Sequence, residues 1–207
     1  MADERPRPHH LAAGAHRAGR LEVVCGCMFS GKSEELIRRL VRADIARQRV
    51  VAVKPAIDSR YAVTAIASHN GRRWPCVSVQ DSAGVAEVVA QHAPDVLGVE
   101  EAQFFDGGLV GVLQRASDRG VRVIVAGLDL DALARPFGPM PALMALAERV
   151  TKLTAVCVRC GADATRSQLL VDGEPAPWRD GPLIDVGGAE SYEARCRACF
   201  AVPDRPA

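Results

Sequence analysis

The sequence predicts an α/β fold, with a mostly parallel sheet covered by helices on both faces and a small cysteine-containing module at the C-terminal end. Three observations support this prediction. Short apolar runs alternate with segments of helical periodicity, a glycine-rich loop follows the first apolar run, and two cysteine pairs lie beyond residue 153. With 207 residues, 48% of them hydrophobic, the chain can bury a core of ordinary domain size.

Four short apolar runs predict the strands of the sheet. They comprise residues 21–25, 50–54, 96–99 and 121–126. Their β-branched residues and their lack of polar–apolar alternation are typical of parallel strands buried on both faces.

Segments of helical periodicity separate these strands. They comprise residues 33–48, 82–92, 106–119 and 142–150. In the first of them, one face is apolar and the other charged; the apolar face carries Leu36, Ile37, Leu40, Val41 and Ile45. The alternation of strand and helix implies right-handed crossovers and a layered α/β fold.

The composition divides the chain into four segments. We expect a disordered N-terminal tail at residues 1–19, an α/β domain at 20–153, a small module at 154–201 and a C-terminal tail at 202–207. The net charge of +1 gives no electrostatic case for nucleic-acid or membrane partners. There is no long apolar segment and no signal peptide, so we expect a cytoplasmic protein whose cysteines stay reduced.

A phosphate-binding loop is predicted by the pattern G-x-x-x-x-G-K-[ST]. The matching residues are Gly26, Cys27, Met28, Phe29, Ser30, Gly31, Lys32 and Ser33. An apolar strand precedes the loop and an amphipathic helix follows it, which places the loop's N–H groups and the helix N-terminus around a phosphate. We expect Lys32 to contact the β- and γ-phosphates of ATP and Ser33 to bind Mg²⁺. The fold is then of the P-loop (RecA-like) class; a turn without nucleotide is the alternative.

Two carboxylates, Glu100 and Glu101, end the predicted strand at 96–99. In a parallel sheet this end of the strand lies beside the phosphate loop. One carboxylate is suited to holding Mg²⁺ and the other to acting as general base, although a solvated strand end would show the same pattern. The absence of an N-K-x-D run disfavours a GTPase.

Two C-x-x-C pairs predict a structural Zn²⁺ site. Cys157 and Cys160 are separated by 35 residues from Cys196 and Cys199. Four thiolates fill a tetrahedral zinc site completely, so the metal would be structural and not catalytic. A disulfide pair or redox chemistry is the alternative.

A series of motifs resembles the type II thymidine kinases, which are cytosolic and contain zinc. The resemblance extends over residues 20–201. The motifs are, in order, the loop at 26–33 with Phe29 inside it, KPAIDSRY at 54–61, SHNG at 68–71, EEAQFF at 100–105, AGLD at 126–129, PFG at 136–138 and KLTAVC at 152–157.

The resemblance implies ATP- and Mg²⁺-dependent phosphorylation of the 5′-hydroxyl of thymidine to thymidine monophosphate, a step in DNA precursor synthesis, by a homotetramer. It implies that Glu101 is the general base, that Lys32 and Arg60 stabilise the transferring phosphate, and that Asp58, Glu100 and Gln103 assist at the ATP and Mg²⁺ site. It places a zinc ribbon with a lasso loop over the nucleoside. The implied nucleoside contacts are Met28, Phe104, Leu128, Ser167, Leu183, Ile184, Asp185, Val186, Gly187 and Tyr192.

Several residues depart from the family pattern. Glu100 and Ser167 stand where Asp and Thr are usual, Ala132 replaces an aromatic residue, and Asp185 replaces an aliphatic residue in the lasso loop. The phosphate-binding residues are intact, whereas the nucleoside pocket is altered. Two alternatives therefore stay open: a deoxynucleoside kinase with a different base preference, and a non-catalytic P-loop and zinc-ribbon binding protein.

Overall fold

A parallel sheet of six strands forms the centre of the computed structural model, which describes residues 19–57, 64–67, 71–176 and 191–201. The strand order is β5-β2-β6-β7-β1-β8, and every neighbouring pair is parallel. The strands are β1 (Arg20–Gly26), β2 (Val50–Pro55), β5 (Val77–Val79), β6 (Val96–Val99), β7 (Arg122–Gly127) and β8 (Arg149–Leu153). The predicted parallel sheet is confirmed.

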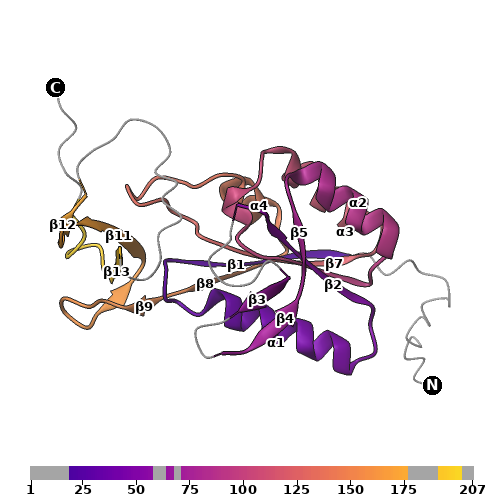
Figure 1. Ribbon diagram of the computed structural model, residues 1–207, viewed down its shortest axis with the longest axis horizontal. Helices are drawn as coiled ribbons and strands as arrows, with labels where there is room; N and C mark the ends of the chain where they lie inside the picture. Colours follow the sequence, from indigo (N-terminus) through magenta and orange to yellow (C-terminus); the bar gives the residue numbers. More distant parts are fainter. Residues whose placement is uncertain (1–18, 58–63, 68–70, 177–190, 202–207) are drawn as a thin grey trace, which may run out of the picture.

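Helices cover both faces of this sheet, as predicted (Figure 1). One face packs against α1 (Lys32–Ile45), and the other against α2 (Ser82–His92), α3 (Gly108–Asp118) and α4 (Met140–Leu146). Along β1 the side chains alternate between the two layers: Val23 and Cys25 pack on the α3 side and Val24 on the α1 side. This alternation explains why β1 reads as a continuous apolar run in the sequence.

Local signals set the bounds of α2. The side chain of Asp81 accepts a hydrogen bond of 2.9 Å from the N–H of Gly84 and caps the first turn. The helix ends at His92, before Ala93, which has a φ of 40°. An N-terminal Asp cap and a left-handed residue after the helix are frequent helix boundaries, and the bounds match the predicted segment.

The predicted helix at 142–150 is wrong in its second half. The helix is α4 (Met140–Leu146), and Val150 belongs to β8, which pairs with β1. β8 is at the edge of the sheet, and 41% of Val150 is exposed. An edge strand that is solvated on one side lacks the apolar run by which the central strands are recognised.

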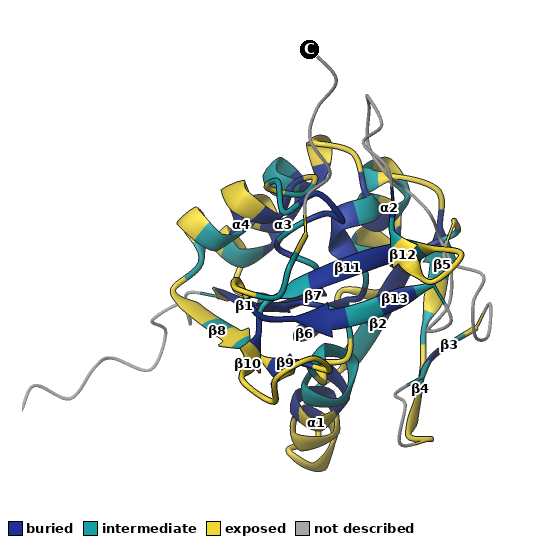
Figure 2. Cartoon of the chain, turned by 90° about the vertical axis from the view of Figure 1, so that its left-hand side faces the viewer, coloured by how far each residue is buried: buried dark blue, intermediate teal, exposed yellow. Residues whose placement is uncertain are grey.

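Small antiparallel sheets follow β8 and lie at one end of the large sheet (Figure 1). Their strands are β9 (Ala155–Val156), β10 (Asp163–Ala164), β11 (Arg166–Val171), β12 (Glu174–Pro175) and β13 (Tyr192–Arg195). Figure 2 shows that much of β11 and β13 is buried. A further antiparallel pair of strands, β3 (Ala65–Ala67) and β4 (Arg73–Pro75), lies near α1. None of the described helices is long and apolar enough to cross a membrane.

A buried ionic network joins β1 to its neighbours. Glu22, 1% exposed, accepts hydrogen bonds of 2.9 Å from Arg39 of α1 and 2.7 Å from Arg122 of β7. Arg20 adds a third bond of 2.6 Å, and Arg39 also donates to the hydroxyl of Thr151 on β8 at 2.9 Å. The network therefore ties three strands and one helix together.

Replacing Glu22 by Gln should destabilise the protein by about 3 kcal/mol at pH 7, because the arginines lose their buried counter-charge. Burial would raise the pKa of Glu22, but the bonds from Arg122 and Arg20 outweigh it and lower the pKa from 4.5 to about 2. The stabilisation is therefore present above pH 4.5 and is lost as the pH falls towards 2. Urea unfolding of both proteins at pH 7 and pH 3 should show the difference shrinking in acid. Exposed Glu87→Gln is the control and should change stability by less than about 0.5 kcal/mol.

Candidate active site

The loop between β1 and α1 has the conformation of an anion cradle. Left-handed backbone occurs at Phe29 and Gly31, with φ of 65° and 84°, and Gly26 has a φ of 145°. A Cβ on Gly26 would lie 2.4 Å from the carbonyl oxygen of Leu153, so only glycine fits there. α1 begins directly after Gly31, and its free N–H groups add positive partial charge at the loop. Together these features make a site suited to phosphate.

The carbonyl oxygen of Cys27 accepts two side-chain hydrogen bonds within this loop. Lys32 Nζ donates to it at 2.7 Å, and Ser30 Oγ donates to it at 2.8 Å. The Lys32 side chain therefore folds back over the loop, and its ammonium group lies against the loop's backbone. Burial lowers the pKa of Lys32, and the carboxylates of Glu101 and Glu100 oppose this shift.

Glu100 and Ser33 are brought together, as the sequence led us to expect. Glu100 follows β6, is 5% exposed and accepts a hydrogen bond from Ser33 Oγ. A carboxylate and a hydroxyl, both oxygen ligands, are the partners that Mg²⁺ takes beside a nucleotide's phosphates. The residues present therefore fit a magnesium ion at this point.

Glu101 has an unusual backbone that directs its side chain. Its φ and ψ are 50° and 43°, the left-handed region, which a non-glycine residue occupies at a cost. Its carboxylate accepts a hydrogen bond from Gln103 Nε2, and Gln103 Oε1 in turn accepts from the N–H of Leu128 at 3.0 Å. Gln103 is 2% exposed and thus links the end of β6 to the end of β7. This chain of bonds fixes the carboxylate of Glu101 at the carboxyl edge of the sheet.

Lys54 is a residue at the site that sequence reasoning did not assign. It lies near the end of β2, is 1% exposed, and lines a small cavity together with Ser33, Glu100 and Glu101. Its position inside an apolar strand is a signal in the sequence, because burying an ammonium group is costly without a specific environment.

An apolar cluster adjoins the phosphate loop through Met28. Met28 packs against Ala132, Leu169, Ala176 and Tyr192. Met28 and Tyr192, both predicted nucleoside contacts, thus lie in one cluster, and so does Ala132, which is 7% exposed.

The loop that carries Ala132 is held by hydrogen bonds within itself. The carboxylate of Asp131, 7% exposed, accepts bonds of 2.9 Å from the N–H groups of Leu133 and Arg135. The Arg135 side chain adds a bond of 2.8 Å. Ala132 therefore sits in a loop of defined shape.

Three other predicted nucleoside contacts have partners within the chain. Phe104 packs edge-on against Phe137, with ring centroids 5.7 Å apart. Leu128 donates its N–H to Gln103, and Ser167 Oγ accepts from the N–H of Met28 at 2.9 Å. The other predicted site residues lie outside the described part of the chain; they are Asp58, Arg60, Leu183, Ile184, Asp185, Val186 and Gly187.

The four cysteines of the two C-x-x-C pairs meet in space. Their sulfur atoms all lie within 4.8 Å of one another, and those of Cys160 and Cys196 are 3.6 Å apart. That separation is too long for a disulfide and close to the roughly 3.8 Å expected between two ligands of a tetrahedral zinc–thiolate site. The cluster therefore fits a zinc ion.

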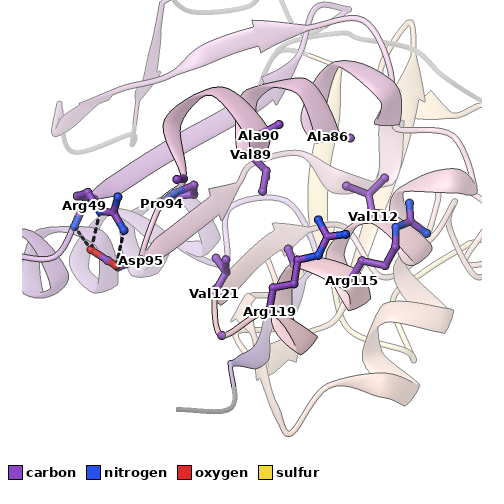
Figure 3. Close-up of a pocket in the computed structure, with 13 residues that line it drawn as sticks. Arg49, Ala86, Val89, Ala90, Pro94, Asp95, Val112, Arg115, Arg119 and Val121 are labelled. Carbon is purple, nitrogen blue, oxygen red and sulfur yellow. Dashed lines mark hydrogen bonds and ion pairs between the residues drawn. The ribbon is translucent and has the colours of Figure 1, made fainter. Parts of the chain in front are cut away.

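A separate cavity, drawn in Figure 3, lies beside the amino-terminal ends of β2, β6 and β7. It has a volume of about 430 Å³ and lies between the carboxyl ends of α2 and α3, near the start of β6. Arg115 and Arg119 line it and offset the negative partial charge at the carboxyl end of α3. Ligands of parallel sheets bind at the carboxyl ends of the strands, so this cavity is not the nucleotide site.

Comparison with known proteins places these features in a family. A family model described as thymidine kinase matches residues 19–200. Among solved structures, the chain is similar to the Legionella pneumophila ATPase DotB, with a TM-score of 0.39 and 16% identity over 62% of this chain. The match spans 34% of the length of that ATPase.

Proposed function

The chain belongs to the thymidine kinase family, and on that premise we propose that it transfers the γ-phosphoryl group of ATP to the 5′-hydroxyl of thymidine. The observation that carries the proposal is that three groups lie together at the carboxyl ends of the strands. Lys32 lies over the phosphate loop, Ser33 bonds to Glu100, and the next residue, Glu101, is held by Gln103. An acceptor hydroxyl placed beside Glu101 would face a phosphate held by the loop.

The residues divide the reaction between them. The carboxylate of Glu101 takes the proton of the 5′-hydroxyl as the oxygen attacks the γ-phosphorus and ADP leaves. Lys32 and the N–H groups of the loop hold the phosphates, and Arg60 and Asp58 assist them. Glu100 and Ser33 would hold Mg²⁺, which neutralises phosphate charge when bound.

The nucleoside would bind against the apolar cluster around Met28 and Tyr192. Backbone groups of the lasso loop at 183–187 would read the base, with Phe104, Leu128 and Ser167 nearby. Ala132, a small residue within this cluster, favours a second candidate: a kinase of the same mechanism whose pocket also accepts deoxyuridine or analogues.

A panel of nucleosides tests both candidates. Purified protein with ATP and Mg²⁺ should convert thymidine to its monophosphate, detected by chromatography of the product. A product from deoxyuridine at comparable kcat/KM would favour the broader base preference. If neither nucleoside yields a product, both kinase proposals fail and a non-catalytic binding protein becomes the better account.

We also propose that the four cysteines hold a structural zinc ion. Purified protein should contain about one zinc per chain. Cys157→Ser should lose zinc and destabilise the small sheets, since metal binding supplies folding free energy in such modules. Metal analysis and limited proteolysis would measure both effects, with half-buried Cys76→Ser as the zinc-retaining control. A Cys157→Ser protein that stays folded without zinc would contradict this role.

The family resemblance supports three further proposals. The protein would work as a homotetramer in the cytoplasm and supply thymidine monophosphate for DNA synthesis. Light scattering of the purified protein at micromolar concentration tests the tetramer.

A further inference from the structure

The side chain of the second residue of the phosphate loop packs into the cysteine-containing module. Cys27 is 3% exposed, and its Sγ donates a hydrogen bond of 3.2 Å to the carbonyl oxygen of Ala164 in β10. It packs in one buried cluster with Ala155, Cys157, Ala164, Ala194 and Cys196. Two members of that cluster belong to the four-cysteine group, which Cys27 does not join as a ligand.

A second bond ties the next residue to the same module. The N–H of Met28 donates to Ser167 Oγ of β11 at 2.9 Å. Cys27 and Met28 are consecutive, so the peptide unit between them is held on β10 and β11 by one side chain and one backbone group. The loop is therefore fixed by contacts from outside its own strand and helix.

The same peptide unit positions the groups that face the phosphates. The carbonyl of Cys27 accepts from Lys32 Nζ and from Ser30 Oγ. A shift of Cys27 would therefore displace the ammonium group of Lys32 and the hydroxyl of Ser30. Displacements of about 1 Å at positioned groups are costly for binding and catalysis.

We propose that Cys27 is a positioning residue that couples metal binding at the four cysteines to nucleotide binding at the phosphate loop. The proposal rests on the function proposed above and adds to it a role for the metal outside its own module. Bound zinc would hold Cys157 and Cys196 in place. These two residues pack with Ala164 and Cys27 in one buried cluster, and the carbonyl of Cys27 accepts the hydrogen bond from Lys32. Coupling between two binding sites is reciprocal, so bound nucleotide must strengthen zinc binding by the same factor as zinc strengthens nucleotide binding.

Two equilibrium measurements test this coupling. The first is the Kd of a fluorescent ADP analogue for zinc-loaded protein and for protein stripped with a chelator. The second is the affinity for zinc, in competition with a chromogenic chelator, with and without ADP. We expect zinc removal to raise the Kd for the analogue about 5- to 100-fold and ADP to raise zinc affinity by the same factor. Equal Kd values with and without zinc would overturn the proposal.

Variants locate the coupling at the proposed contacts. Cys27→Ala removes the thiol and its hydrogen bond to Ala164. Ser167→Ala removes the hydroxyl that accepts from the N–H of Met28. The protein with both substitutions should have a coupling factor close to one. Ser167→Thr keeps the acceptor hydroxyl, so the coupling factor lost in Ser167→Ala should return with threonine at this position. Cys25→Ala is the matched control because Cys25 is a fully buried thiol on β1 that packs in the main core. It should lower stability but keep the wild-type factor.

These outcomes separate the inference from the kinase proposal. A double variant with the full wild-type factor would show that the coupling does not pass through Cys27. Zinc-dependent binding of ADP without any nucleoside product would leave the inference standing and remove the kinase proposal. Product formation together with zinc-independent ADP binding would support the kinase proposal and overturn the coupling inference.

Discussion

Replacing Glu101 by Gln is expected to lower kcat about 10²- to 10⁴-fold, the usual contribution of a positioned general base. Gln has the same length as Glu, and its amide oxygen can still accept the bond from Gln103 Nε2. It cannot take the proton of the 5′-hydroxyl. The substitution therefore removes the chemistry and preserves the shape of the site. Steady-state kinetics with thymidine and ATP would measure the loss, and equilibrium binding of an ADP analogue should stay close to wild type.

Two further variants make this result specific. Glu101→Asp keeps a carboxylate but withdraws it by about 1.5 Å, so its kcat should fall between those of the wild type and Glu101→Gln. Exposed Glu87→Gln on α2 should behave as wild type. Near-normal turnover by Glu101→Gln would assign the general base to another group. Loss of ADP-analogue binding together with turnover would indicate a structural role for Glu101 instead.

The central strands and helices could be predicted because each of them has a distinct pattern in the sequence. The strands β1, β2, β6 and β7 are buried on both faces, so their apolar runs stand out. The motif from Gly26 to Ser33 fixed the junction of strand and helix, and the observed α1 begins within it, at Lys32.

The two edge strands of the sheet, β5 and β8, could not be predicted in this way. β5 has only three residues, and the exposed part of β8 resembles the end of an amphipathic helix. Pairing with β1 decides the structure of Val150, and that pairing is formed by residues more than a hundred positions away. Local propensity cannot encode such a contact.

The candidate site likewise contains some contacts that the sequence motifs predicted and others that they did not. The proximity of Glu100 to Ser33 followed from motif positions in a parallel sheet. The bond from Gln103 to Leu128 and the burial of Lys54 depend on how separate strand ends meet. The sequence motif places Cys27 in the phosphate loop but does not show what its side chain contacts. Its contact with Ala164, 137 positions away, favours a packed and hydrogen-bonded side chain.

Removing the charge of Lys32 should be nearly as damaging as removing the general base. Lys32→Met keeps most of the side chain's volume but deletes the ammonium group that would meet the β- and γ-phosphates. Loss of one preorganised donor to transition-state charge costs about 10²- to 10³-fold in kcat, and we expect a loss of this size. Kinetics at saturating thymidine with varied ATP would measure it.

The geometry of Lys32 also predicts how a conservative replacement behaves. Lys32→Arg keeps the charge but replaces a compact ammonium group by a planar fork, and the Cys27 carbonyl that receives Lys32 at 2.7 Å lies inside a tight loop. Arg should therefore rescue little of the lost activity. Arg38→Gln is a suitable control, because Arg38 lies on an exposed part of α1 and pairs with Glu35. Full activity in Lys32→Met would mean that phosphate binds elsewhere, and full rescue by Arg would mean that the loop is looser than its bonds to Cys27 imply.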